Sequence, residues 1–334
     1  MSNAHDSGVG SSRRSSSSAL LSADGRYEVE RLLSLQLCMS PVPLPENVLA
    51  NWRNWSSDQA ESVIANAQDR LATAIDAWQL TDLAPMPGGE VALVLVATSP
   101  AGEAVLKVNP NLAGDTDVLA TEPRALALWS GAGAAPQVYA TRDNGLTMLL
   151  QRVRPGTTLR EATTDAMSIV GTLGGLCRVV HQHVDPQRFC RLADGSEANG
   201  WRRKLAGTRE HDELERLLKP SSDDRLLHTD LHRINALRSG NRWVLIDPKP
   251  HLGDPHADVF GFMYGAPLRD IPHQLAVGRE YLRKLTATYA TAAGLDRDRV
   301  VAWLRIRALA AALWAQREDP HWARELFHLL ETLD

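Results

Sequence analysis

The chain has 334 residues, of which 44% are hydrophobic, and this is enough to build two lobes that each have their own core. Its formal net charge of −4 argues against a nucleic-acid-binding protein, and it contains no run of eighteen apolar residues that could span a membrane. Its three cysteines, Cys38, Cys177 and Cys190, include no CxxC pair, so we expect free thiols and a cytoplasmic protein.

The chain begins with a segment that is poor in core-forming residues. Residues 1 to about 24 are rich in serine, glycine and charged side chains, which cannot bury a core. They also lack the long apolar segment of a secretory signal. We therefore expect a disordered, serine-rich extension over residues 1–40, and we hypothesise that activity does not require it.

The next part of the chain is predicted to form a small sheet with helices. Apolar side chains recur at three- and four-residue steps between residues 59 and 79, which predicts an amphipathic helix. A second helix is expected from about Thr121, because Pro123 is tolerated only in a first turn. Pro155 and Gly156 are expected to end the strand region. Apolar runs predict four strands, at residues 90–97, 103–108, 136–141 and 146–152.

From about residue 160 the pattern becomes helical, interrupted by hairpins at residues 226–247. Helices are predicted over residues 164–183, 274–293, 298–317 and 320–333. A small antiparallel sheet with one helix, followed by a larger helical part, predicts an α+β, bilobal fold. The N-terminal lobe is expected over residues 41–153 and the C-terminal lobe over residues 154–334.

The hairpin region carries the most specific chemistry in the sequence. Asp230 is followed five positions later by Asn235, and Asp247 ends the second strand of the predicted hairpin. Phosphoryl transfer from a nucleotide requires a carboxylate that orients or deprotonates the acceptor hydroxyl, together with oxygen ligands for magnesium. We therefore predict that Asp230 is the catalytic base and that Asn235 and Asp247 are metal ligands.

Lys107 and Glu122 are the candidates for binding nucleotide phosphates. Lys107 lies near the end of a predicted strand, and Glu122 lies near the start of the following helix. A buried lysine needs a partner of opposite charge, and a Lys–Glu pair that holds nucleotide phosphates meets this need.

Further nucleotide contacts are expected from the backbone. Gly88 and Gly89 could let backbone amides approach phosphate, although an ordinary turn accounts for them equally well. The segment from Gln151 to Val153 connects the predicted lobes, and we expect its backbone to hold adenine. This last assignment rests on position alone.

Several residues of the hairpin region are expected to support the site. His228 is predicted to hydrogen-bond across the loop, and Asp258 either to stabilise the loop or to cap the next helix. Lys249 either contacts phosphate or offsets local negative charge. His232 is predicted to be a loop residue without a chemical role.

A metal-dependent hydrolase is an alternative for the same region, since histidine and carboxylate ligands suit zinc or manganese. This alternative leaves Asn235 and Asp247 without a function. A protein-substrate kinase fits poorly, because little room for an activation segment remains after Asp247. The candidate hydrolase ligands are His228, Asp230, His232, His251, Asp254, His256 and Asp258.

With these residues identified, the chain resembles the aminoglycoside phosphotransferase family, in particular its streptomycin 6-phosphotransferase and hydroxyurea phosphotransferase branch. The resemblance runs from about Pro43 to the C-terminus and is carried by AVLKVNP, LLQRVRPGTTL, LLHTDLHRIN and WVLIDPKPHLGDP. It implies a protein-kinase-like fold, ATP as donor with Mg²⁺, and the roles given above to Asp230, Asn235 and Asp247. Thr229 and Pro250 depart from the family pattern, which commonly has glycine at both positions.

The activity that the resemblance implies is transfer of the γ-phosphoryl group of ATP to a hydroxyl of a small polar acceptor, such as streptomycin or a related antibiotic. The alternatives are a kinase of hydroxyurea, a sugar or another metabolite, and a non-catalytic nucleotide-binding pseudokinase. We expect a monomer or weak dimer. Acidic residues of the C-terminal helices are expected to hold a cationic acceptor, and the candidates are Asp270, Glu280, Glu318 and Asp319.

Overall fold

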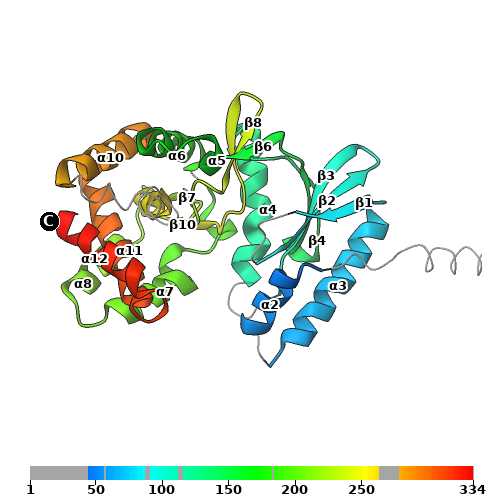
Figure 1. The fold of residues 1–334 in the computed structure, drawn as a ribbon, viewed down its shortest axis with the longest axis horizontal. Coiled ribbons are helices and arrows are strands. Elements are labelled where there is room, and N and C mark those ends of the chain that lie inside the picture. Colours follow the sequence, from blue (N-terminus) through cyan, green and yellow to red (C-terminus); the bar gives the residue numbers. More distant parts are fainter. Residues whose placement is uncertain are drawn as a thin grey trace, which may run out of the picture. The chain divides into compact units, whose positions relative to one another are not determined.

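The computed structural model describes residues 44–55, 58–86, 91–111, 116–182, 184–262 and 278–333 (Figure 1). The predicted extension over residues 1–40 lies outside the described residues, as do Gly88, Gly89 and Asp270. The chain from Leu44 onward forms one compact unit.

An antiparallel sheet contains the four strands predicted for the first half of the chain. Its central strand β3 pairs with β2 on one side and β5 on the other. Side chains alternate along a strand, so Lys107 of β3 lies on the opposite face from the buried Leu106 and Val108. The strands are β1 (Thr81–Pro85), β2 (Leu93–Ser99), β3 (Gly102–Val108), β4 (Val138–Arg142) and β5 (Thr147–Gln151), in the order β1-β2-β3-β5-β4.

Two helices precede this sheet in the chain. Helix α3 (Ala60–Ala77) confirms the predicted amphipathic helix and packs on β3 and β5 (Figure 1). Helix α2 (Glu46–Trp55) packs against α3, and its Trp52 is fully buried. The Trp52 indole donates a hydrogen bond to the carbonyl oxygen of Val91 at 2.7 Å, which ties α2 to the segment that precedes β2.

Helix α4 (Thr116–Gly131) begins before Thr121, so the prediction that Pro123 lies in a first turn is wrong. Pro123 lies in the helix interior, where its ring nitrogen donates no hydrogen bond to the preceding turn. The segment η1 (Asp143–Gly145) packs against this turn so closely that a Cβ atom at Gly145 would meet the Ala120 carbonyl oxygen at 2.3 Å. Tertiary packing therefore supports the helix where proline weakens it.

A smaller three-stranded sheet carries the predicted hairpin. It contains β6 (Pro155–Thr158), β8 (Ala236–Ser239) and β9 (Arg242–Leu245), with β8 in the middle. The prediction that Pro155 and Gly156 end the strands is wrong, because the chain continues into β6. Pro155 is the first residue of an edge strand, where the missing N–H is tolerated. Close to this sheet in sequence, β7 (Arg225–Leu227) pairs with β10 (His251–Gly253).

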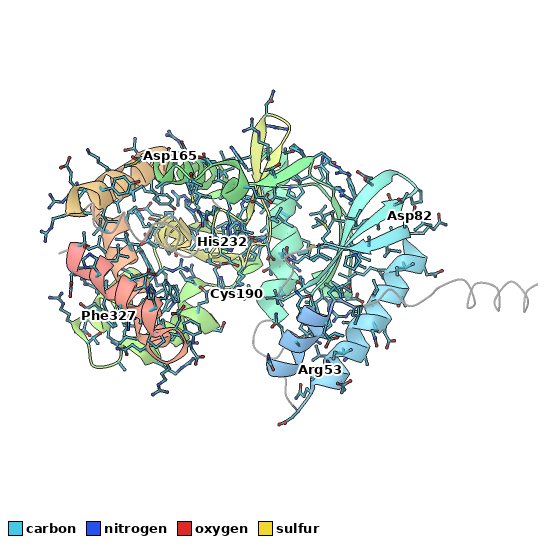
Figure 2. The ribbon with its side chains drawn as sticks, in the orientation of Figure 1. Arg53, Asp82, Asp165, Cys190, His232 and Phe327 are labelled. Atoms are coloured by element: carbon cyan, nitrogen blue, oxygen red, sulfur yellow. The ribbon has the colours of Figure 1, made fainter. Side chains whose placement is uncertain are left out.

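The rest of the described chain is mainly helical, and the four helices predicted for this half are confirmed as α6, α10, α11 and α12. Asp165 caps the start of helix α6, because its side chain accepts a hydrogen bond from the Ser168 amide at 2.9 Å (Asp165 is labelled in Figure 2). The helices are α5 (Leu159–Ala162), α6 (Ala166–Val180), α7 (Ser196–Leu205), α8 (Arg209–Leu217), α10 (Gly278–Ala293), α11 (Arg297–Glu318) and α12 (Pro320–Leu333). Short 3₁₀ segments are η2 (Pro186–Arg188), η3 (Leu192–Asp194) and η4 (Pro255–Phe262).

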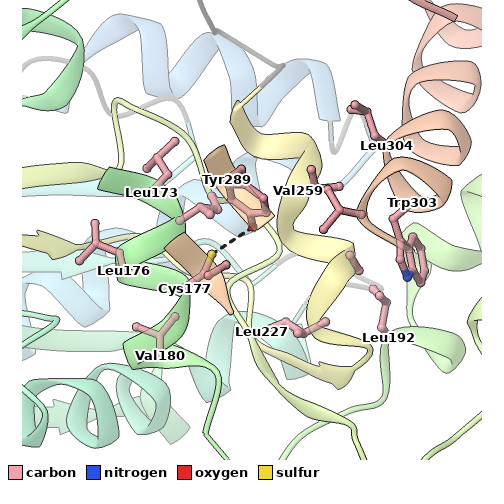
Figure 3. Packing of buried hydrophobic residues seen from close by; sticks show 14 of the residues in the cluster. Leu173, Leu176, Cys177, Val180, Leu192, Leu227, Val259, Tyr289, Trp303 and Leu304 are labelled. Carbon is pink, nitrogen blue, oxygen red and sulfur yellow. Dashed lines mark hydrogen bonds between the residues drawn. The ribbon is translucent and has the colours of Figure 1, made fainter. Parts of the chain in front are cut away.

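The core of the helical part forms where α6 packs on α10 (Figure 3). The apolar stripe of α6 is buried, and Cys177 on the same helix lies 3.2 Å from the hydroxyl of Tyr289 in α10. Burial raises the pKa of the Cys177 thiol well above its usual range, so this cysteine behaves as an apolar side chain. Both described cysteines, Cys177 and Cys190, are free thiols, as predicted.

Among the described residues, no helix is long and apolar enough to cross a membrane.

Candidate active site

The candidate catalytic loop connects β7 to β8 and contains both Asp230 and Asn235. The Asn235 side-chain nitrogen donates to the carbonyl oxygen of Asp230 at 3.0 Å, and the Asn235 amide donates to the His232 carbonyl oxygen at 2.9 Å. Asn235 is buried, whereas Asp230 is half-buried. The loop is thus closed on itself by the asparagine, and the carboxylate of Asp230 remains accessible.

Asp247 lies two residues after the end of β9 and close to the first sheet. Its carboxylate accepts a hydrogen bond from the Lys107 ammonium at 2.5 Å, although the two residues are 140 positions apart. The Asp247 side chain is 55% exposed. Burial would raise the pKa of Asp247, but the charge of Lys107 outweighs it and lowers the pKa below its usual range. Asp247 is therefore an ionised, accessible carboxylate at the point where β3 meets the hairpin.

The expected pair of Lys107 and Glu122 is present. The Lys107 ammonium lies 2.7 and 2.8 Å from the two carboxylate oxygens of Glu122, and both side chains are almost fully buried. Asn109 donates to the same carboxylate at 3.1 Å. Burial would lower the pKa of Lys107, but the charges of Asp247 and Glu122 outweigh it and raise the pKa. Lys107 is consequently a fixed positive charge between α4 and Asp247.

Asp258 stabilises the start of the catalytic loop. Its carboxylate accepts hydrogen bonds from the backbone amides of His228 at 2.9 Å and Thr229 at 2.7 Å. The His181 ring, which follows α6, lies 2.9 Å from the same carboxylate. Burial would raise the pKa of Asp258, but these hydrogen bonds outweigh it and lower the pKa. Of the two possible roles for Asp258, the structure shows hydrogen bonding to the loop.

His228 lies at the base of the loop with its ring fully buried. The ring nitrogen Nε2 lies 3.1 Å from the Ile246 carbonyl oxygen, so His228 spans from the loop to the end of the hairpin. The ring also stacks on Trp129 of α4, with centroids 5.8 Å apart and planes 5° apart. Burial lowers the pKa of His228 although Asp258 opposes it, so the ring is neutral at physiological pH.

The alternative metal cluster of a hydrolase is not assembled. His251 contacts the Lys249 carbonyl oxygen at 2.8 Å, and His256 contacts Asp254 at 2.6 Å. In the described part of the chain, the one group of three side chains at metal-ligand separation is Cys177, His181 and Asp258. Asp258 is its sole member from the proposed hydrolase set, and its carboxylate is already occupied by backbone amides. The geometry therefore contradicts the hydrolase interpretation.

Thr229 has an unusual backbone conformation, with φ at +53°. Its amide donates to Asp258, its hydroxyl donates to the Lys249 carbonyl oxygen, and its own carbonyl oxygen accepts from the Arg307 guanidinium at 3.4 Å. Arg307 is a buried residue of α11 that also donates to the Ala257 carbonyl oxygen at 2.5 Å. Arg307 was missed from the sequence, where it lies within an apolar helical stripe.

Two further side chains approach the Asp230 carboxylate. The Lys249 ammonium lies 3.5 Å from one oxygen, and the His232 ring nitrogen Nε2 lies 3.7 Å from the other. The same His232 nitrogen lies 3.2 Å from the Asn235 side-chain nitrogen (His232 is labelled in Figure 2). His232 thus lies between the predicted base and a predicted metal ligand, a position that the sequence pattern did not indicate.

The residues predicted to bind adenine lie at the end of β5. The Gln151 amide donates to the Gln137 carbonyl oxygen at 2.8 Å, and its side-chain oxygen accepts from the Gln137 amide at 3.2 Å. Val153 follows the strand and is half-buried. These contacts fix Gln151 against the start of β4. Gly88 and Gly89 lie outside the described residues.

The acidic residues predicted to hold an acceptor are distributed differently from expectation. Glu280 pairs with Lys284 on the surface of α10, and Asp319 accepts from the Trp322 amide at the start of α12. Glu318 is exposed at the end of α11, and Asp270 lies outside the described residues. Glu197 of α7, which the sequence did not single out, is close enough to Lys249 to raise its pKa.

The donor set fits a magnesium ion bound with nucleotide phosphates. The side-chain nitrogen of Asn235 is already engaged within the loop, which leaves its side-chain oxygen for a cation. Asp247 offers an ionised and accessible carboxylate. Oxygen ligands of this kind are those that magnesium prefers when it also binds phosphate.

Comparison with known proteins places this geometry in a family. The family model described as aminoglycoside/hydroxyurea antibiotic resistance kinase matches residues 77–319. Streptomycin 6-kinase of Streptomyces glaucescens is 28% identical over 296 residues, which cover 82% of this chain and 91% of that protein. Hydroxyurea phosphotransferase of Kitasatospora aureofaciens is 29% identical over 300 residues, which cover 82% of this chain and 80% of that protein.

Solved structures are similar in fold. A thermostable mutant of an aminoglycoside phosphotransferase, in ternary complex with ADP and hygromycin B, superimposes with a TM-score of 0.53 at 14% identity, covering 78% of this chain and 97% of that one. A choline/ethanolamine kinase family protein from Mesorhizobium loti gives a TM-score of 0.52 at 18% identity, covering 80% and 94%. These similarities confirm the predicted α+β, protein-kinase-like fold.

Proposed function

Because the chain belongs to the aminoglycoside/hydroxyurea antibiotic resistance kinase family, we propose that it phosphorylates a hydroxyl of streptomycin or of a closely related aminoglycoside. The chain is a phosphotransferase that acts on a small-molecule acceptor and binds a nucleotide. The observation that carries the proposal is the position of Asp230, Asn235 and Asp247 around one loop and hairpin, with Lys107 reaching Asp247 from the sheet.

Asp230 is the base in this proposal. Its accessible carboxylate accepts the proton of the acceptor hydroxyl while the acceptor oxygen bonds to the γ-phosphorus of ATP and the bond from that phosphorus to the ADP oxygen breaks. General base catalysis of this kind contributes roughly 10²–10⁴ in rate. The hydrogen bond from Asn235 to the Asp230 backbone keeps the carboxylate at a fixed place in the loop.

Asn235 and Asp247 would hold Mg²⁺, which supplies positive charge against the β- and γ-phosphates when it is bound. Lys107 is expected to contact the nucleotide phosphates, and Glu122 positions its ammonium. We assign adenine to the backbone from Gln151 to Val153, and the backbone near Gly88 and Gly89 to the phosphates. His228 and Asp258 hold the loop and do not react.

Hydroxyurea is a second candidate acceptor, because the hydroxyurea phosphotransferase of Kitasatospora aureofaciens is as similar to this chain as the streptomycin 6-kinases are. A pseudokinase is disfavoured, since the lysine, the proposed base and both metal-ligand candidates are all present, with Lys107 bonded to Asp247 and Asn235 bonded to the Asp230 backbone.

Purified protein should consume ATP in a coupled assay with streptomycin, and mass spectrometry should detect the phosphorylated product. Other aminoglycosides and hydroxyurea are assayed in parallel. The variant Asp230→Asn should lose about 10²-fold or more in turnover while its affinity for MgADP stays near that of the wild type. Asp223→Asn, on an exposed turn before β7, is the matched control. Turnover of Asp230→Asn at the wild-type rate would falsify the assignment of the base.

A further inference from the structure

Lys249 is attached to the catalytic loop by its backbone. Its amide donates to the His228 carbonyl oxygen at 3.0 Å, and its carbonyl oxygen contacts the Thr229 hydroxyl and the His251 ring. The peptide units on both sides of Lys249 are therefore fixed against the residues that precede Asp230. Its side chain begins from a rigid position two residues after Asp247.

The Lys249 ammonium lies among three carboxylates. It is 3.5 Å from an oxygen of Asp230, and its side chain remains 44% exposed. Partial burial would lower the pKa of Lys249, but the charges of Asp230, Glu197 and Asp247 outweigh it and raise the pKa. The side chain therefore places a positive charge beside the carboxylate of the proposed base.

The two lysines of the site differ in how many of their ammonium N–H groups are already engaged in the structure. The Lys107 ammonium directs its three N–H groups to two oxygens of Glu122 and one of Asp247. Among the described residues, the Lys249 ammonium has one carboxylate partner within 4.0 Å, and that contact is long. Lys249 thus keeps N–H groups that can turn toward a substrate oxygen.

A purely structural ion pair does not account for this arrangement. A half-exposed pair of this length contributes little to stability, because water screens it. A positive charge beside the proposed base, on a side chain that starts two residues after a proposed metal ligand, instead suits the place where negative charge accumulates on a phosphoryl group during transfer. Donors fixed at such a place are the largest single contribution to many enzymatic rates.

We propose that Lys249 is a second catalytic residue, whose ammonium donates a hydrogen bond to a non-bridging oxygen of the phosphoryl group in transit. The inference rests on the phosphotransferase function proposed above. Lys249 keeps its proton throughout: the acceptor proton goes to Asp230, the acceptor oxygen bonds to phosphorus, and ADP leaves with the electrons of the broken bond. In this arrangement Lys107 binds the nucleotide phosphates, and Lys249 binds the phosphoryl group that is transferred.

The variant Lys249→Met tests the proposal. We expect kcat to fall by about 10²–10³, while KM for MgATP changes by no more than a few fold, because the contact is made mainly in the transition state. Lys249→Arg, which keeps the charge, should recover part of the loss. Lys284→Met, an exposed lysine on α10, is the matched control and should behave like the wild type. Melting temperatures of all three variants establish that they are folded.

Binding of MgADP with aluminium fluoride, a mimic of the transferring phosphoryl group, provides the second measurement. Aluminium fluoride should tighten MgADP binding by the wild type and much less by Lys249→Met, whereas MgADP alone binds both equally. A kcat for Lys249→Met within about threefold of the wild type, or a loss confined to KM for MgATP, overturns the proposal. If the wild type phosphorylates no acceptor, the proposed function fails, and the aluminium fluoride comparison alone decides the role of Lys249.

Discussion

Thr229 is held in the left-handed region of backbone conformation, which β-branched residues rarely occupy. Such a conformation costs about 1–3 kcal/mol, and it persists only where the surrounding structure compensates. Here the compensation comes from hydrogen bonds to Asp258, to the Lys249 carbonyl oxygen and from Arg307. The hydroxyl is the part of this set that glycine could not supply.

Removing the hydroxyl alone should therefore be more harmful than removing the whole side chain. Thr229→Val keeps the strain and loses a buried hydrogen bond, so we expect it to lower the free energy of unfolding by about 1–3 kcal/mol. Thr229→Gly loses the same bond but relieves the strain, and should stay within about 1 kcal/mol of the wild type. Urea denaturation of both variants measures the difference. Equal stability of the valine variant and the wild type would show that the hydroxyl contributes nothing.

For single residues, the sequence identifies candidates that belong to a local motif and misses those that reach the site from distant segments of the chain. Asp230, Asn235 and Asp247, to which we assign the base and the metal ligands, are recognisable by their spacing within one hairpin region. Arg307 contacts Thr229 across 78 positions, and the apolar residues around it in the sequence do not indicate which element it contacts. Glu197 near Lys249 is missed for the same reason. Convergence of this kind depends on packing between elements, which periodicity does not encode.

Asp254 joins the turn between β10 and η4 to helix α11. Its carboxylate accepts hydrogen bonds from the Trp303 indole at 2.6 Å and the Arg299 guanidinium at 2.7 Å, and the His256 ring contacts it at 2.6 Å. Burial would raise the pKa of Asp254, but the hydrogen bonds with His256 and Trp303 outweigh it and lower the pKa to about 2. Helix α11, whose side chains bind Asp254, thereby helps to position η4. Since η4 carries Asp258, α11 also helps to position the catalytic loop.

This depressed pKa predicts a specific dependence of stability on pH. A carboxyl whose pKa is lower in the folded state stabilises the fold above its unfolded value, and this contribution is lost as pH falls through the folded value. For Asp254 the loss should occur between pH 3.8 and about 2, and it should amount to about 2 kcal/mol. The Asp254→Asn variant should lack this part of the acid dependence, as measured by denaturation at several pH values.

The control for this measurement is Asp298→Asn, at an exposed position of α11, the helix whose side chains contact Asp254. It should retain the wild-type acid dependence. An unchanged acid dependence in Asp254→Asn would mean that another carboxyl controls stability in this range.

Elements with a strong period are predicted well, and elements whose limits depend on tertiary contacts are not. Helix α6 and the hairpin of β8 and β9 follow directly from their apolar patterns and turn residues. The start of α4 is missed because packing against η1 supports a proline inside the helix. Strand β6 is missed because proline commonly ends a strand. Here Pro155 begins an edge strand that pairs with β8.

For the whole molecule, the contact between Lys107 and Asp247 connects the first sheet to the catalytic hairpin. Nucleotide bound to both elements should stabilise the folded chain by mass action. With MgADP at about 100 times its dissociation constant, we expect a gain of about 2.7 kcal/mol in the free energy of unfolding. Asp247→Asn should lose most of this gain at the same MgADP concentration, because it weakens the proposed metal ligand and its contact with Lys107.

Thermal unfolding with and without MgADP measures the effect, and Asp223→Asn serves as the control on an exposed turn. Full stabilisation of Asp247→Asn by MgADP would separate Asp247 from nucleotide binding, and the proposed metal site would then need another carboxylate.

The stacking of His228 on Trp129 has an optical consequence. The indole belongs to the helix that carries Glu122, and the imidazole belongs to the base of the loop that carries Asp230. Indole emission responds to the ring beside it, so a shift of α4 against the loop should change the light that Trp129 emits. The chain therefore contains a natural fluorophore at the contact between α4 and the loop of Asp230, and subtracting the signal of Trp129→Phe would isolate it.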